Sequence, residues 1–131
     1  MAIKQILIVD DEERIREVVR MCLVKLGKWE AITAASGQEA IQIAATLKPD
    51  AILLDLSMPE MDGLETLRQL QNHPQTAAIP VIFLTAKAQD PDTDRSTYQQ
   101  LGVAGLIVKP FNPVEISLEI RKILGWDQAI S

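Results

Sequence analysis

Five polar residues follow short apolar runs in this sequence: Asp10, Asp11, Asp55, Thr85 and Lys109. Three carboxylates gathered in one place would repel one another, and a divalent cation bound among them removes that conflict. Hard oxygen ligands without a histidine or cysteine beside them favour Mg²⁺, or Mn²⁺, over zinc. An ammonium and a hydroxyl next to such a cation suit a small tetrahedral anion. If these side chains meet, they favour chemistry on a phosphoryl group.

The apolar runs that precede these residues predict the strands that must position them. The runs lie at 5–9, 30–34, 51–54, 80–84 and 105–108. Four of the five are nearly continuous rather than alternating, which is typical of strands covered on both faces in a parallel sheet.

Amphipathic patterns between and after the runs predict helices at about 15–26, 36–47, 64–70, 93–101 and 112–124. The apolar stripe of the first helix consists of Ile15, Val18, Val19, Cys22, Leu23 and Leu26. Ser36 and Glu39 have the spacing of a capping box, which opens the second helix. Asn112 followed by Pro113 is typical of an N-cap and the first position of a helix.

Strands that alternate with helices imply right-handed crossovers and a parallel sheet with helices on both faces. The predicted fold class is therefore α/β, with a single doubly wound domain of five strands and five helices. In such sheets ligands bind at the carboxyl ends of the strands. The five polar residues are expected to share that edge.

Each of these residues also has an ordinary structural explanation. Asp10 and Asp11 could cap the first helix and complement its dipole, and Asp55 could cap a turn. Threonine, as at Thr85, is common at the end of a strand. Lys109 could simply be a solvated lysine at the end of a strand. The coincidence that all of them fall at the same edge, each after its own apolar run, favours a functional site.

Length and composition limit the class of protein. The chain has 131 residues, of which 47% are apolar and 24% charged, with a net charge of −5. These values predict one globular domain at 1–125 and a short C-terminal tail at 126–131. An acidic chain without a basic cluster is not expected to bind nucleic acid directly. One cysteine, no signal peptide and no apolar stretch of membrane length predict a cytoplasmic protein.

Four motifs together resemble the receiver domain of two-component response regulators. They are "ILIVDDE" at 6–12, "LLDLSMPEMDG" at 53–63, "LTAKA" at 84–88 and "LIVKPF" at 106–111. The resemblance covers roughly residues 4–124. It implies a flavodoxin-like fold with strand order 2-1-3-4-5, and a phosphorylation-dependent signalling switch rather than an enzyme with its own substrate.

The resemblance also implies a role for each acidic residue. Asp55 resembles the phosphoacceptor, which takes its phosphoryl group from a phosphohistidine of a sensor kinase or phosphotransfer protein. Asp11 resembles the direct Mg²⁺ ligand and Asp10 a water-mediated one. The backbone carbonyl of Ser57 would complete the protein ligands of the metal.

The remaining roles belong to the switch. Thr85 resembles the hydroxyl that moves toward the phosphoryl group, and Lys109 the lysine that pairs with it. The backbone N–H of Ala86 is expected to donate to a phosphoryl oxygen. Leu106 stands where the family often has an aromatic residue, so coupling through such a ring is not expected here.

The expected partners are the phosphodonor protein and a downstream protein target, without nucleic acid or membrane. A homodimer could form through the fourth helix, the fifth strand and the fifth helix. Two other functions are considered. The chain could be a receiver-like scaffold that acts without phosphorylation, or a metal-dependent phosphatase with an aspartyl nucleophile. Such phosphatases usually carry a second carboxylate two residues after the nucleophile, where this chain has Ser57.

Overall fold

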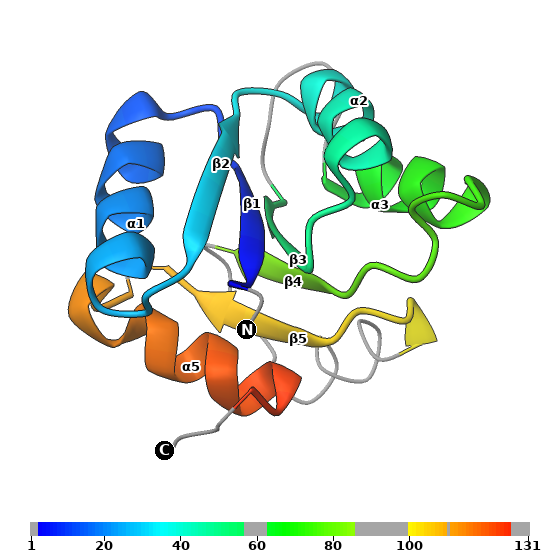
Figure 1. The fold of residues 1–131 in the computed structure, drawn as a ribbon. Helices are drawn as coiled ribbons and strands as arrows, with labels where there is room; N and C mark the ends of the chain where they lie inside the picture. Colours follow the sequence, from blue (N-terminus) through cyan, green and yellow to red (C-terminus); the bar gives the residue numbers. More distant parts are fainter. Residues whose placement is uncertain (1–2, 57–62, 86–99, 110, 127–131) are drawn as a thin grey trace.

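The computed structural model describes residues 3–56, 63–85, 100–109 and 111–126 (Figure 1). Five parallel strands form a single sheet with the order β2-β1-β3-β4-β5. The strands are β1 (Gln5–Val9), β2 (Glu30–Ala34), β3 (Ala51–Asp55), β4 (Val81–Thr85) and β5 (Gly105–Val108). The predicted fold class and strand order are confirmed.

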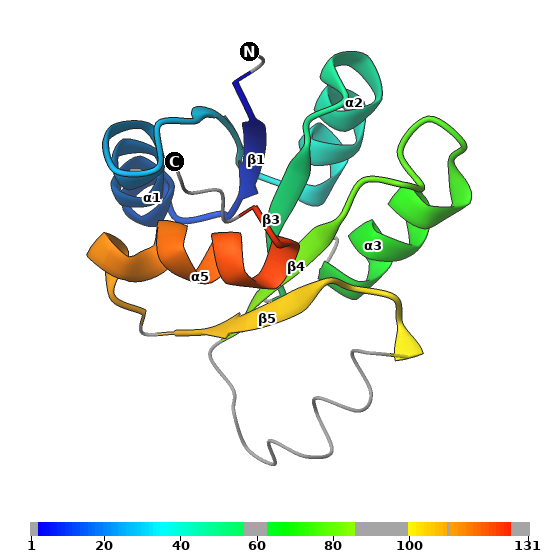
Figure 2. The same ribbon diagram turned by 60° about the horizontal axis from the view of Figure 1, so that its bottom comes forward.

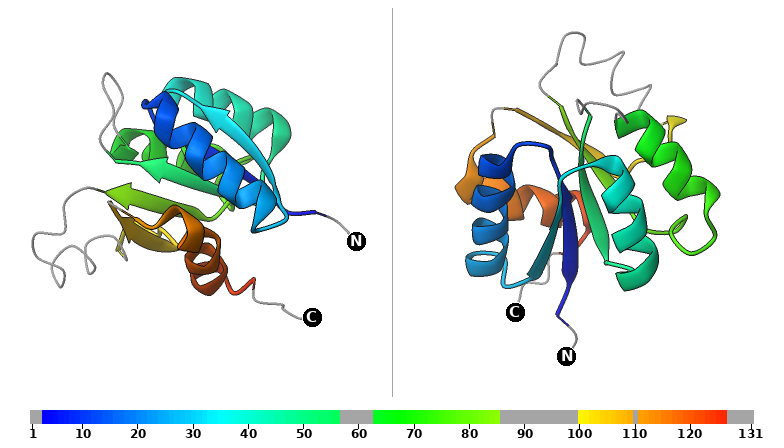
Figure 3. Two further views of the ribbon diagram at one scale, coloured as in Figure 1. Left: turned by 90° about the vertical axis from the view of Figure 1, so that its left-hand side faces the viewer. Right: turned by 90° about the horizontal axis from the view of Figure 1, so that it is seen from above.

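Four α-helices lie within the described part of the chain. They are α1 (Glu13–Lys25), α2 (Gly37–Leu47), α3 (Gly63–Asn72) and α5 (Ile116–Leu124). The helices α1 and α5 cover one face of the sheet, and α2 and α3 cover the other (Figures 2 and 3). The helix predicted at 93–101 falls outside the described residues except at its last two positions. None of the described helices is long and apolar enough to cross a bilayer.

The continuous apolar runs are explained by two separate cores, one on each face of the sheet. Ile6 and Ile8 of β1 pack with residues of α1 and α5, whereas Leu7 and Val9 pack with residues of α2 and α3. Successive side chains of a strand point to opposite faces, so a strand covered on both sides has no polar position. This is why Asp10, Asp55, Thr85 and Lys109 appear only where their strands end.

The capping box predicted for the second helix is confirmed. The hydroxyl of Ser36 accepts from the backbone N–H of Glu39 at 3.2 Å, and the Glu39 carboxylate accepts from the N–H of Ala35 at 2.9 Å. At the last helix, the Asn112 side chain accepts from the N–H of Val114 at 3.0 Å, as expected of an N-cap. The turn that follows is a separate 3₁₀ helix, η1 (Pro113–Glu115), so Pro113 does not begin the α-helix itself.

The apolar stripe predicted for the first helix is wrong at two positions. Val19 and Leu23 are fully buried, but Val18 is 38% exposed and Leu26 is 48% exposed. The sheet and α5 cover a strip of the α1 surface that is narrower than the apolar stripe, so Val18 at its margin stays exposed. Leu26 also lies beyond the last helical residue, as the C-cap.

The C-terminal end of α5 turns back onto the amino-terminal edge of the sheet. Gly125 ends the helix in the left-handed conformation, with φ of 72°. Trp126 then packs edge-on against Trp29, with 5.4 Å between ring centroids and an interplanar angle of 81°. The ammonium of Lys4 lies 4.9 Å from the centroid of the Trp126 ring. Trp126 thus folds back on the domain, and residues 127–131 of the predicted tail lie outside the described range.

Candidate functional site

The polar residues meet at the carboxyl edge of the sheet because of the register of its central strands. Val9 of β1 pairs with Leu54 of β3, so Asp10 and Asp55 are the next residues along two adjacent strands. Asp55 in turn pairs with Leu84 of β4, which precedes Thr85. The site therefore follows from sheet pairing and does not depend on a long loop.

Three carboxylates form an acidic cluster, defined here as Asp10, Asp11 and Asp55. Each offers one oxygen that lies within 4.8 Å of those of the other two. Asp10 and Asp55 are 0% and 3% exposed, whereas Asp11 is open to solvent. This spacing allows one small cation to be held directly or through a bound water. Oxygen donors alone fit Mg²⁺ or Mn²⁺, because neither ion needs nitrogen or sulfur ligands.

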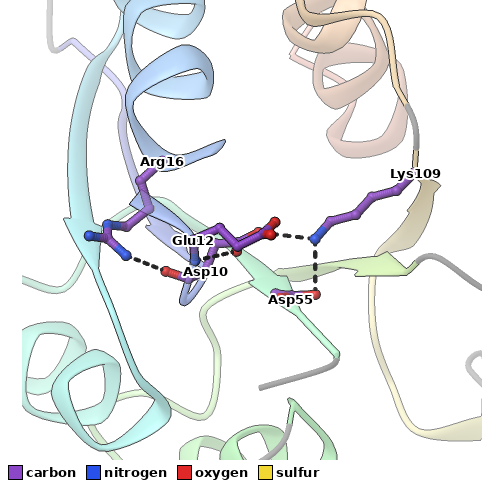
Figure 4. Close-up of polar contacts among 5 residues, drawn as sticks. All are labelled: Asp10, Glu12, Arg16, Asp55 and Lys109. Carbon is purple, nitrogen blue, oxygen red and sulfur yellow. Dashed lines mark hydrogen bonds and ion pairs between the residues drawn. The ribbon is translucent and has the colours of Figure 1, made fainter. Parts of the chain in front are cut away.

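Lys109 supplies the positive charge that the cluster lacks. Its Nζ lies 3.2 Å from Asp10 Oδ2 and 3.4 Å from Asp55 Oδ1 (Figure 4). Burial acts to lower the pKa of the Lys109 ammonium. The charges of Asp10 and Asp55 and hydrogen bonds to both outweigh burial, so the pKa is raised above its ordinary value. The lysine is therefore charged at neutral pH.

Asp10 is held by four different parts of the chain. Its backbone N–H donates to the carbonyl of Ala34 in β2 at 3.2 Å. Its Oδ1 accepts from the backbone N–H of Glu12 at 2.9 Å, and its Oδ2 faces Lys109. Its carbonyl accepts from Arg16 Nη1 at 2.7 Å. Asp10 thus satisfies a donor at the start of α1, as its ordinary structural explanation expects, and belongs to the acidic cluster as well.

Among the residues that the structure describes, Arg16 contacts the site although the sequence did not predict it there. It lies near the start of the predicted first helix, where an arginine is usually an exposed surface charge. The sequence does contain a signal of another role for Arg16, because a positive charge near the start of a helix interacts unfavourably with the helix dipole. Only the folded structure shows that the guanidinium turns back toward Asp10 (Figure 4).

Thr85 ends β4 at the same edge and is 4% exposed. Its carbonyl accepts from the backbone N–H of Lys109 at 2.7 Å, which joins the ends of β4 and β5. Leu106 pairs with Phe83 and packs against the core on the α2 and α3 face of the sheet. Thr85 and Leu106 therefore belong to the same strand pair.

Two predicted site residues, Ser57 and Ala86, lie outside the described residues. The metal role of the Ser57 carbonyl and the phosphoryl role of the Ala86 N–H accordingly stay predictions. Of the other predicted residues, the structure brings Asp10, Asp55 and Lys109 into direct contact and Asp11 into their neighbourhood.

Known proteins share both the sequence and the fold of this chain. A family model described as the response regulator receiver domain matches residues 6–121. The transcriptional regulatory protein SrrA of Staphylococcus aureus (strain NCTC 8325 / PS 47) is 42% identical over 125 residues, which are 95% of this chain and 49% of that protein. The chain spans about half the length of the curated relatives it matches.

Solved structures share the fold described above. The chemotaxis response regulator CheY4 of Vibrio cholerae has a TM-score of 0.83 at 30% identity, over 93% of this chain and 99% of that chain. A putative response regulator from Chloroflexus aurantiacus J-10-fl has a TM-score of 0.82 at 31% identity, over 95% of this chain and 99% of that chain.

Proposed function

The chain belongs to the response regulator receiver domain family of two-component systems, and we propose that it is a phosphorylation-dependent switch with Asp55 as its phosphoacceptor. The observation that carries this proposal is the environment of Asp55. Its carboxylate is almost fully buried, lies 3.4 Å from the Lys109 ammonium, and shares an acidic cluster with Asp10 and Asp11. Burial of an ionised carboxylate is costly unless partners hold it in place, so this arrangement suits a reactive group.

The proposed reaction is transfer of a phosphoryl group from a phosphohistidine. A carboxylate oxygen of Asp55 attacks phosphorus, a P–O bond forms and the P–N bond breaks. The imidazole nitrogen leaves with the electron pair and takes up a proton from solvent. Lys109 pairs with a phosphoryl oxygen, while the Thr85 hydroxyl and the Ala86 N–H donate to others. Positioning and charge neutralisation are what phosphoryl transfer needs most from a protein.

The acidic cluster is proposed to hold Mg²⁺ or Mn²⁺ during this reaction. Asp11 is exposed and suits direct coordination, whereas Asp10 is already bonded to Glu12 and Lys109 and suits contact through water. The Ser57 carbonyl would complete the ligands. When bound, the cation neutralises charge on the phosphoryl oxygens.

Phosphorylation would change the charge on Asp55 from −1 to about −2 at neutral pH. Lys109, now shared between Asp10 and Asp55, would shift toward the phosphoryl group. Because Thr85 and Lys109 join the ends of β4 and β5, that shift would reach the surface of β5 and α5. This surface, with the segment before β5, is the proposed contact for a downstream protein or a second copy of the chain.

The proposed partners are a sensor histidine kinase or phosphotransfer protein and a protein target, in the cytoplasm. Direct contact with nucleic acid is not proposed for this domain, because its net charge is −5. SrrA is named a transcriptional regulatory protein, and this chain matches only 49% of its length. In a chain of that kind, DNA binding would belong to another part of the protein.

The test is incubation with acetyl phosphate and Mg²⁺, followed by intact mass spectrometry. One phosphoryl adduct is expected in the wild type and none in Asp55→Asn. Glu115→Gln, which removes an exposed carboxylate of η1, is the matched control and should keep the adduct. An adduct of equal yield in Asp55→Asn would disprove the assignment, and a wild type without an adduct would favour the scaffold function. Continuous phosphate release from varied phosphoesters would favour the phosphatase.

A further inference from the structure

We propose that Arg16 is a positioning residue for the metal site: its guanidinium holds the turn that carries Asp10 and Asp11. The inference rests on the proposed function, since it assumes that these carboxylates bind a divalent cation. Arg16 itself is not proposed to touch the metal or the phosphoryl group. It acts through the backbone carbonyl of Asp10.

The hydrogen bond between Arg16 and Asp10 joins α1 to the turn between β1 and α1. Arg16 Nη1 donates to the Asp10 carbonyl at 2.7 Å, and the Arg16 backbone N–H donates to the Glu12 carbonyl at 3.1 Å. The Glu12 N–H in turn donates to Asp10 Oδ1 at 2.9 Å. These three hydrogen bonds form a closed set within residues 10–16, and Figure 4 shows the two that Asp10 accepts.

Arg16 and Lys109 contact different atoms of Asp10. Arg16, from α1, binds the carbonyl oxygen, whereas Lys109, from the end of β5, lies beside the carboxylate. The N–H of Asp10 is bound to β2 through Ala34. With its N–H, carbonyl and carboxylate all engaged, Asp10 has little freedom to rotate. Asp11 lies between Asp10 and Glu12, so the same hydrogen bonds hold the backbone from which its carboxylate extends.

Electrostatics alone would favour a different residue at position 16. A positive charge near the start of a helix opposes the helix dipole, and a positive charge near a bound divalent cation repels it. The Arg16 charge should therefore weaken metal binding, and only its geometric effect can strengthen it. The charge of Arg16 and its positioning of Asp10 thus change Mg²⁺ affinity in opposite directions, so a titration distinguishes them.

The experiment is titration of the full chain with MgCl₂ by isothermal titration calorimetry. Arg16→Ala is compared with Arg20→Ala, which removes the same charge one turn further along α1. Arg20 pairs with exposed Glu17 of its own helix at 2.8 Å. Arg16→Ala is expected to raise the Mg²⁺ dissociation constant about tenfold relative to Arg20→Ala, the range seen when groups that orient metal ligands are removed. Arg16→Lys, which keeps the charge and one donor, should recover part of the loss.

An Arg16→Ala protein that binds Mg²⁺ as tightly as Arg20→Ala, or more tightly, would overturn the positioning role. Melting temperatures in EDTA show whether the variant is folded. If it is not, Arg16→Gln takes its place, and full Mg²⁺ affinity in that variant would overturn the role equally. Failure of the proposed function has a different signature. In that case the wild type either does not bind Mg²⁺, which overturns both proposals, or binds it and is phosphorylated without Asp55, which overturns only the assignment of the acceptor.

Discussion

Lys109 forms an ion pair with Asp55, and 3.4 Å separate the lysine Nζ from the aspartate Oδ1. Asp55 is the last residue of β3 and Lys109 directly follows β5, and these strands are not neighbours, because β4 lies between them. Adjacent strands are about 4.8 Å apart, so the lysine must reach over the end of one whole strand. A long, flexible side chain is needed for this contact, and it extends further to Asp10 at 3.2 Å. One lysine thus balances carboxylates from two strands.

Removing the charge of Lys109 should destabilise the metal-free protein. In Lys109→Met the carboxylates of Asp10 and Asp55 lose their shared counter-charge, and we expect a loss of about 2 kcal/mol in the free energy of unfolding. Urea unfolding in EDTA measures it. Mg²⁺ should restore part of the loss, because it supplies the missing charge. Lys122→Met, at an exposed position of α5, is the control and should change little; an equal loss in both variants would contradict this account.

The ion pair should also make stability depend on pH in the alkaline range. The pKa of Lys109 is raised above its ordinary value of 10.5 by the two carboxylates, despite burial. A raised pKa means that the stabilisation is complete below the unfolded value and is lost as pH rises through the folded one. Above about pH 10.5, urea unfolding in EDTA should therefore show a steeper decline in the free energy of unfolding of the wild type than of Lys109→Met, in measurements from pH 9 to pH 12. An equal decline in the wild type and in Lys109→Met would show that groups other than Lys109 cause the loss of stability at high pH.

Divalent metal should stabilise the fold through Asp11. A ligand that binds only the native state raises its stability by mass action, so the melting temperature should rise with Mg²⁺ concentration. In Asp11→Asn this rise should be largely lost. The same variant should melt higher than wild type in EDTA, because one of three neighbouring carboxylates is gone.

Glu13→Gln is the control for this experiment, since it removes an exposed carboxylate from the first turn of α1 without touching the acidic cluster. Its melting temperature should follow Mg²⁺ as in the wild type. A full Mg²⁺ response in Asp11→Asn would contradict the assignment of that residue as a metal ligand.

The tryptophan pair, Trp29 and Trp126, should contribute to stability but not to phosphorylation. Trp126→Ala removes the edge-on ring contact and the approach of Lys4, and we expect a loss of about 1–2 kcal/mol in unfolding free energy. Trp126→Phe should recover part of it. Because the pair lies at the amino edge of the sheet, opposite Asp55, the yield of the phosphoryl adduct should be unchanged. A strong effect on the adduct would show that the two edges are coupled.

The sequence by itself determined the strands, most of the helices and the edge at which the site lies. Continuous apolar runs specify strands buried on both faces, and a polar residue marks the end of such a run, as at Val9 followed by Asp10. A capping box is equally readable, because Ser36 and Glu39 lie within one turn of each other. Such signals are local, so a short segment contains all the information they carry.

Only the tertiary structure decided which groups meet. The exposure of Val18 depends on how α1 rests against the sheet and α5, and the contact of Trp126 with Trp29 joins residues far apart in the chain. The turn of Arg16 toward the Asp10 carbonyl depends on the backbone path between them. These contacts are set by packing angles and side-chain rotamers, which arise from the whole fold, and no periodicity in the chain encodes them.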